Sequence, residues 1–150
     1  MNIEEFLRNV DRSSFSTTPY LRKIEKPWGY EIHFTPDNLP YMGKLLHLNE
    51  GAQNSLQVHD QKQESWYWAG GNPIIMLEDS SGTMQEIPLL EGQGYTCVVG
   101  QKHRLRGGSG GGTFFEVSTQ ETGTTYRLQD DYDRSDETET GRLERNKLGA

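Results

Sequence analysis

Short runs of β-prone residues, separated by turn residues, fill the chain from Tyr30 to Ser118. Runs rich in β-branched and aromatic residues predict strands, because such side chains pack well on a pleated surface. The predicted strands lie at residues 30–34, 41–48, 52–59, 64–69, 73–78, 84–88, 95–99 and 113–118. The gaps between them have hairpin length, and Asp79–Gly82 is the clearest turn. This pattern predicts an all-β fold, an antiparallel jelly-roll barrel.

The two ends of the chain have a different character. Apolar residues at helical spacing predict a short amphipathic helix near residues 2–12: Ile3, Phe6, Leu7 and Val10. Its apolar face is expected to pack on the barrel or on a partner subunit. We therefore divide the chain into an N-terminal helix and linker arm at 1–21, a barrel domain at 22–134 and a charged tail at 135–150. The tail is expected to be flexible, with a weak helix around residues 142–145.

A glycine-rich run separates the last two predicted strands. The segment 106–112 contains five glycines and is expected to be a mobile loop near the mouth of the barrel. It lacks the Lys-Ser/Thr ending and the following helix of a phosphate-binding loop.

Composition narrows the possible partners. A chain of 150 residues is expected to form one domain, and its net charge of −7 argues against general nucleic-acid binding. The single cysteine, Cys97, cannot form an intramolecular disulfide, and its apolar neighbours favour a buried structural thiol. The N-terminus lacks the features of a signal peptide, and no apolar run approaches the length of a membrane span. We expect a cytoplasmic protein with no membrane or nucleic-acid partner.

Residues that can bind a metal ion concentrate in two stretches. Gln57 and His59 are two positions apart on a predicted strand, so both side chains leave the same face, with α-carbons about 6.6 Å apart. Glu64 would return on the next strand of a hairpin, and His103 would come from a distant pair of strands. These nitrogen and oxygen donors suit one divalent ion, Zn²⁺ first, with Mn²⁺, Fe²⁺, Co²⁺ or Ni²⁺ as alternatives. The other interpretation is that they are ordinary strand residues, with His59 solvated and His103 satisfied by hydrogen bonds.

The spacing of these residues resembles that of the cupin superfamily. Gly51-x5-Gln57-x-His59-x4-Glu64-x6-Gly71 resembles the first cupin motif, with Gln in place of its first His. Gly92-x5-Val98-x-Gly100-x2-His103-x3-Gly107 resembles the second motif, with Val in place of Pro and Gly in place of Asn. The resemblance implies a cupin barrel that holds its metal ion inside.

Within the cupins, residues 22–134 resemble the C-terminal cupin domain of type II mannose-6-phosphate isomerase / mannose-1-phosphate guanylyltransferase. The matching segments are Ser55-Leu56-Gln57-Val58-His59 with Lys62, Glu64 and Trp66, then Lys26-Pro27-Trp28-Gly29 and His103-Arg104-Leu105. The resemblance implies a metal-dependent conversion of mannose 6-phosphate to fructose 6-phosphate through an enediol, with zinc as the ion.

The same resemblance suggests roles for further residues. Five basic residues near the motifs are candidates for the phosphate: Lys44, Lys62, Lys102, Arg104 and Arg106. Arg104 is the first choice because it follows a ligand and matches the family. Glu116 is the candidate base, although a structural carboxylate or a lysine base remains open. Four side chains are candidates for holding the sugar: Lys62, Trp66, Trp68 and Tyr95. Core packing is the alternative role for the aromatic residues, and a solvated strand-end position is the alternative for Arg104.

The leading hypothesis is a stand-alone metal-dependent sugar-phosphate isomerase that acts as a homodimer. A partner related by two-fold symmetry would cover the N-terminal helix and the edge strands. One alternative is a redox-metal cupin dioxygenase, which would usually carry His at the position of Gln57. The other is a non-enzymatic carbohydrate-binding cupin, which the bulky aromatic strand leaves open.

Overall fold

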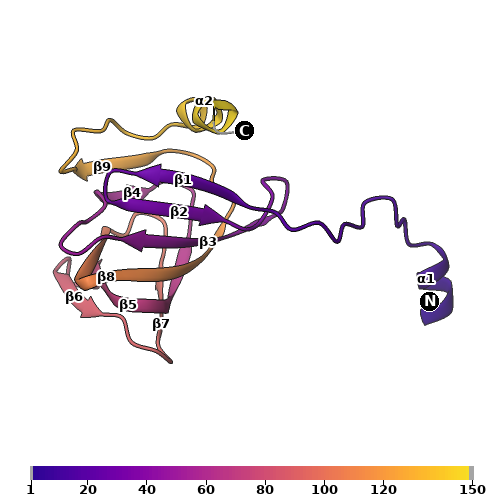
Figure 1. The fold of residues 1–150 in the computed structure, drawn as a ribbon, viewed down its shortest axis with the longest axis horizontal. Coiled ribbons are helices and arrows are strands. Elements are labelled where there is room, and N and C mark those ends of the chain that lie inside the picture. The colour runs from indigo at the N-terminus through magenta and orange to yellow at the C-terminus, as the bar shows by residue number, and fades with distance from the viewer. Residues whose placement is uncertain (1, 149–150) are drawn as a thin grey trace.

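A computed structural model describes residues 2–148 and shows a curled antiparallel sheet with a short helix at each end of the chain (Figure 1). The elements are, in order, α1 (Ile3–Arg8), β1 (Arg22–Lys26), β2 (Gly29–His33), β3 (Tyr41–Leu48), β4 (Leu56–His59), β5 (Glu64–Glu78), β6 (Met84–Pro88), β7 (Gly94–Cys97), β8 (His103–Thr119), β9 (Thr125–Gln129) and α2 (Glu139–Leu148). The predicted all-β jelly roll with a short N-terminal helix is confirmed.

Strand β8 organises the sheet. The strand order is β1-β2-β3-β8-β4-β9, and β5 also pairs with β8 along nearly its whole length. The early part of β8 contacts β4 through the pair Gln57 and His103, and the later part pairs with β3. Because β8 contacts three strands, it brings residues from distant parts of the chain to one inward face.

The hydrophobic core lies between the walls of this curled sheet. Its buried members are Trp28, Leu46, Leu48, Trp66, Ile75, Leu89, Cys97, Leu105 and Phe114. Cys97 is buried, as its apolar neighbours predicted. The core occupies one part of the interior, and the space beside it is lined by polar and charged side chains.

The glycine-rich run is part of a strand, so the expected loop at residues 106–112 is wrong. A Cβ atom at Gly107 would lie 2.3 Å from the carbonyl oxygen of Asn49, and one at Gly112 would lie 2.4 Å from the nitrogen of Pro73. Glycine therefore allows neighbouring backbones to approach β8 more closely than any side chain would permit. The glycine-rich run therefore marks the part of β8 where neighbouring backbones pack closely.

The C-terminal segment also has more structure than we expected. The predicted weak helix at residues 142–145 lies within α2, and the buried Arg142 donates to the carbonyl oxygens of Glu121, at 2.8 Å, and Gly123, at 3.3 Å. Backbone hydrogen bonds in both directions also join Glu137 to Thr125 on β9. These contacts hold the segment along the strand ends above β1 and β9 (Figure 1). The boundaries of the three predicted regions stay predictions.

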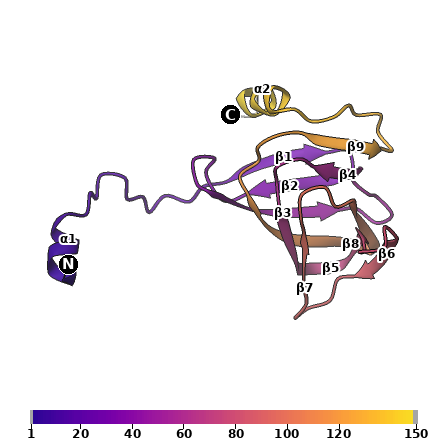
Figure 2. The same ribbon diagram turned by 180° about the vertical axis from the view of Figure 1, so that it is seen from behind.

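The N-terminal arm extends away from the barrel (Figure 2). Helix α1 is shorter than predicted, because Asn9 caps it directly after Arg8. Its apolar residues Ile3, Phe6 and Leu7 are exposed, so this face does not pack on the barrel of its own chain. Within residues 2–148, neither helix has the length and apolar character needed to cross a membrane.

Replacing Gly107 tests the close packing at β8. We expect Gly107→Ala to lower the free energy of unfolding by about 1–3 kcal/mol, because the new methyl group would overlap the backbone at Asn49. Gly94→Ala is the control, since its Cβ would lie no closer than 3.7 Å to another residue, and it should stay within about 0.5 kcal/mol of wild type. Denaturant unfolding measures both, and equal stability of the two variants would contradict the strand assignment.

Candidate metal centre

Three side chains that can bind a metal ion converge inside the barrel. His59 ends β4, Glu64 begins β5 and His103 begins β8, and all three are buried. A Glu64 carboxylate oxygen, Oε1, lies 2.8 Å from His103 Nε2 and 3.2 Å from His59 Nε2. The three candidate ligand atoms lie within 4.8 Å of one another. The convergence follows from the short β4–β5 connection and the pairing of β4 with β8, and it brings together three of the four predicted ligands.

Neighbouring groups fix the direction of both imidazoles. His59 Nδ1 lies 2.9 Å from Thr125 Oγ1, and His103 Nδ1 lies 3.0 Å from the carbonyl oxygen of Gln101 and 3.1 Å from Cys97 Sγ. Since these contacts engage Nδ1, each ring presents Nε2 to the centre. Hydrogen bonds of this kind commonly orient metal-binding histidines.

The fourth predicted ligand, Gln57, reaches the same centre. Its amide nitrogen lies 3.3 Å from His103 Nε2, and its amide oxygen accepts a hydrogen bond of 2.7 Å from Ser55 Oγ. Rotation of the amide by half a turn would present the oxygen to the centre and let the NH₂ group donate to Ser55, whose hydroxyl can also accept. Gln57 can therefore complete a set of two imidazoles, one carboxylate and one amide oxygen.

Glu64 supplies the negative charge at the centre. Burial opposes the charge of Glu64, but nearby Lys62 and the two imidazoles hold its pKa well below the usual range. Burial lowers the pKa of His59. Burial also acts to lower the pKa of His103, yet its hydrogen bonds with Cys97 and Glu64 raise that pKa to about 10. A proton on His103 thus lies where an ion would bind, and an ion would have to displace it.

A lysine links the centre to a second carboxylate. Lys62 Nζ lies 2.8 Å from Glu64 Oε2 and 3.3 Å from Glu116 Oε2. The indole nitrogen of Trp66 donates to the other oxygen of Glu116 at 3.0 Å. Burial and the charge of Glu64 raise the pKa of Glu116. A carboxyl group with a raised pKa beside a metal ligand is suited to accept and return a proton.

Lys44 lies next to this pair but has further partners that the sequence did not predict. Its ammonium lies 3.4 Å from Glu116, 2.5 Å from Glu121 and 3.9 Å from Glu31. Glu31 also lies 2.7 Å from the imidazole of His33. Glu31 and His33 alternate on one strand, which would have placed both on one face, but no motif drew attention to them. Glu121 lies in a connection, where no periodicity could have identified it.

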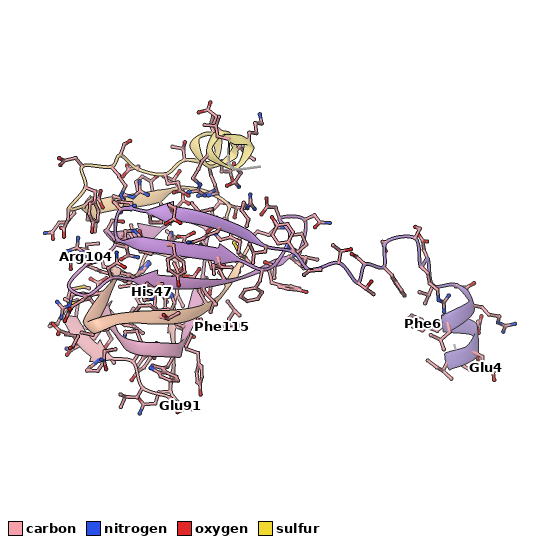
Figure 3. The ribbon with its side chains drawn as sticks, viewed as in Figure 1. Glu4, Phe6, His47, Glu91, Arg104 and Phe115 are labelled. Atoms are coloured by element: carbon pink, nitrogen blue, oxygen red, sulfur yellow. The ribbon has the colours of Figure 1, made fainter. Side chains whose placement is uncertain are left out.

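Three predicted residues lie apart from this centre. Arg104 donates to the carbonyl oxygens of Asn54, at 2.8 Å, and Gln129, at 3.1 Å, and it lies near one end of the barrel (Figure 3). It follows His103 on a strand, so its side chain leaves the opposite face. The indole of Trp68 donates to the carbonyl of Gly71, and the hydroxyl of Tyr95 lies 3.4 Å from Gln93. By contrast, the Trp66 ring centroid lies 5.4 Å from that of His103. The roles proposed for Arg104, Trp68 and Tyr95 stay predictions.

A cavity of about 60 Å³ lies beside the candidate ligands. Its wall includes Gln57, His59 and Glu64 together with residues of β9 and the C-terminal segment. The charged residues of the wall are Lys26, Glu31, Lys44, Lys62, Glu64, Glu116, Glu121, Arg127, Arg134, Glu137 and Arg145. The cavity therefore favours a polar ligand over an apolar one.

Comparison with known proteins supports the fold. No protein-family model matches the sequence, and no curated protein matches it. A deletion mutant of oxalate decarboxylase OxdC from Bacillus subtilis has a TM-score of 0.64 and 19% identity, over 85% of this chain and 38% of its own. This chain thus spans less than half the length of that protein. The capsular polysaccharide assembling protein CapF from Staphylococcus aureus has a TM-score of 0.57 and 15% identity, over 89% of this chain and 35% of its own.

KdgF from Halomonas sp. is similar as well, with a TM-score of 0.55 and 14% identity, over 66% of this chain and 86% of its own. At these identities the likenesses show the fold alone. They support the jelly-roll fold predicted from the sequence.

The hydroxyl that orients His59 offers a test of metal binding. We expect purified protein to bind one divalent ion per chain, and Thr125→Val to weaken that binding about 10–100-fold, because His59 loses the contact to its Nδ1. His103→Ala should remove most of the binding. Calorimetric titration with Zn²⁺ and elemental analysis measure these effects.

A matched threonine–histidine pair provides the control. Thr113 Oγ1 lies 2.8 Å from Nδ1 of His47, which lies on the outer face of the sheet (Figure 3). Thr113→Val should leave the affinity for zinc unchanged. If the two valine variants weaken binding equally, the assignment of the centre is wrong.

Proposed function

We propose that this protein is a metal-dependent sugar-phosphate isomerase, which interconverts an aldose phosphate and its ketose, with mannose 6-phosphate and fructose 6-phosphate as the first pair to test. The observation that carries the proposal is the position of Glu116. Its carboxyl group has a raised pKa and is joined through Lys62 to the candidate metal ligand Glu64. A proton-transferring group beside a cation is the arrangement that isomerisation requires.

We infer that Gln57, His59, Glu64 and His103 would hold the ion, with zinc as the first choice. When bound, the ion supplies positive charge that stabilises negative charge on the substrate oxygens. Lys62 separates the carboxylates of Glu64 and Glu116 and balances part of their charge. The protein can therefore keep Glu116 as a base close to the ligands.

The proton transfer would proceed in three steps that balance. In the aldose, the carboxylate of Glu116 accepts the proton from C2, the electrons of the broken C–H bond form the C1–C2 double bond, and O1 takes the electron pair of the former carbonyl bond. The hydroxyl proton of O2 then passes to O1. Finally Glu116 returns its proton to C1 with the electrons of the C1–C2 double bond, and the electron pair on O2 forms the ketone. The hydrogen bond from Trp66 fixes the direction of the carboxyl group during the first and last steps.

Isotope exchange tests the proposed reaction. In D₂O, metal-loaded protein should introduce deuterium at C2 of mannose 6-phosphate. Glu116→Gln should slow this exchange by about 10²–10⁴-fold, because the amide cannot accept the proton. Its metal content should equal that of wild type. Mass spectrometry of the recovered sugar and elemental analysis measure both effects.

The control is Glu86→Gln, which removes a carboxylate that pairs with Arg106 and does not line the cavity. This variant should exchange at the wild-type rate. A complete lack of exchange with every hexose phosphate, at full metal loading, would refute the isomerase. Sugar binding without exchange would then favour a carbohydrate-binding protein, and oxygen uptake with iron would favour a dioxygenase.

We also propose a homodimer, supported by an apolar patch on the outer face of β3, β8 and β5. The patch consists of Tyr41, Tyr67, Phe115 and Val117 together with Phe34, which directly follows β2, and all five are exposed. Phe34 and Phe115 stack with ring centroids 5.4 Å apart, and Phe115 points outward from the sheet (Figure 3). The exposed apolar face of α1 from a second copy would cover such a patch.

The single free cysteine, buried at Cys97, accords with the proposed cytoplasmic location.

Light scattering tests the dimer. Wild type should have the mass of two chains at micromolar concentration, and Phe115→Asp should convert it to a monomer, since the new carboxylate would be buried without a partner. Glu91→Gln, a change at an exposed position outside the patch, should remain dimeric. A monomeric wild-type protein would refute the proposal.

A further inference from the structure

The cavity is cationic although the protein is acidic. Its wall contains six lysine and arginine side chains and five glutamates, whereas the whole chain carries a net charge of −7. A divalent ion at the candidate metal centre would add two further positive charges. An anionic ligand would offset this positive charge.

The three arginines of the wall come from β9 and the C-terminal segment, and Arg127 lies opposite Gln57 in the pairing of β9 with β4. We define the C-terminal arginine cluster as Arg127, Arg134 and Arg145, which all line the cavity. Burial lowers the pKa of Arg127, and the nearby charges of Arg134 and Arg145 lower it further. Within residues 2–148, the buried Nε atoms of Arg127 and Arg145 have no hydrogen-bond partner. Arg134 is paired with Asp130 through contacts of 3.0 and 2.6 Å, so the unused donors belong to Arg127 and Arg145. Arginines with unused donors are typical of a site for phosphate or carboxylate.

We propose that the C-terminal arginine cluster binds the phosphate group of the substrate. The identity of the ligand as a sugar phosphate rests on the proposed function. This proposal replaces the role that sequence resemblance suggested for Arg104, whose guanidinium already donates to two backbone carbonyls. The sugar would then lie between the cluster and the metal centre, with Glu116 beside it.

A carboxylate of the protein already occupies part of this site. Glu137 Oε2 lies 2.9 Å from Arg145 Nη1 and 3.4 Å from Arg127 Nη2, and Glu137 Oε1 accepts from Arg142 Nε at 3.1 Å. The backbone of Glu137 pairs with Thr125, whose hydroxyl contacts the ligand His59. Glu137 thus acts as an internal anion that a phosphate must displace.

The size of the cavity also requires the C-terminal segment to move when a sugar phosphate binds. A volume of about 60 Å³ holds about two waters and cannot hold a sugar phosphate. Polar contacts join the segment from Asp130 to Leu148 to the barrel at residues 121, 123 and 127, and Tyr132 packs against the core. A phosphate that takes over the arginines would weaken the ion pairs of Glu137 and let this segment move outward.

Calorimetry tests the proposal by measuring how the zinc-loaded full chain binds inorganic phosphate and mannose 6-phosphate. Arg145→Gln should weaken both ligands about tenfold, because a charged hydrogen-bond donor is lost. Glu137→Gln should strengthen both, because the competing carboxylate is gone. Arg106→Gln is the control, since Arg106 pairs with Glu86 and does not line the cavity, and it should bind like wild type.

If the C-terminal arginine cluster has only a structural role, these binding measurements give a different result. Glu137→Gln would then bind phosphate no better than wild type, and this outcome would overturn the proposal. Equal affinity of wild type and Arg145→Gln for phosphate would also overturn it. Because Arg145 is partly exposed, this variant tests the site even if Glu137→Gln does not fold. Tighter binding of a uronic acid than of either phosphate ligand would exclude phosphate as the natural group.

The two proposals can fail separately. Deuterium exchange at C2, together with unchanged phosphate affinity in Arg145→Gln, would refute the arginine site and retain the isomerase. If both variants change phosphate affinity as expected but the protein shows no deuterium exchange, the isomerase is refuted and the anion site is retained.

Discussion

The candidate site depends on one buried carboxylate, that of Glu64. Its two oxygens face His59, His103 and Lys62 at distances between 2.8 and 3.2 Å. A buried carboxylate without such partners would cost several kcal/mol, so the surrounding positive charge offsets the desolvation of this group. The same charges hold the pKa of Glu64 low and keep it available as a ligand. Metal binding and proton transfer at Glu116 would both be linked to this carboxylate through Lys62.

The pairing of β8 with its neighbours builds the site around that carboxylate. His103 at the start of β8 contributes a candidate ligand, and Glu116 near its end contributes the proposed base. Strand β5 pairs along β8 and sets Trp66 beside Glu116. Glycines in β8 permit the close backbone contacts on which this arrangement relies. Chemistry and fold therefore share the same two strands.

Charge is distributed unequally along the cavity. Near the metal centre, lysines and glutamates pair closely, as Lys62 does with Glu64 and Glu116. In the C-terminal segment, the carboxylate of Glu137 is shared among three arginines. An anionic substrate would thus contact both the arginines and a bound ion, which would set its orientation relative to Glu116.

Much of the fold and the candidate centre could be predicted from sequence because strand periodicity is local. Alternation placed Gln57 and His59 on one face, and motif spacing related them to Glu64 and His103. The same periodicity also separates Arg104 from His103, which shows that resemblance alone is a weak guide to a side chain's direction. Local composition gave a wrong prediction for residues 106–112, since glycines suit a loop and also a strand crossed closely by another backbone. Only the tertiary structure could bring Glu121, Arg127 and Glu137 to the cavity, because long-range strand pairing and the docking of α2 decide which distant side chains meet.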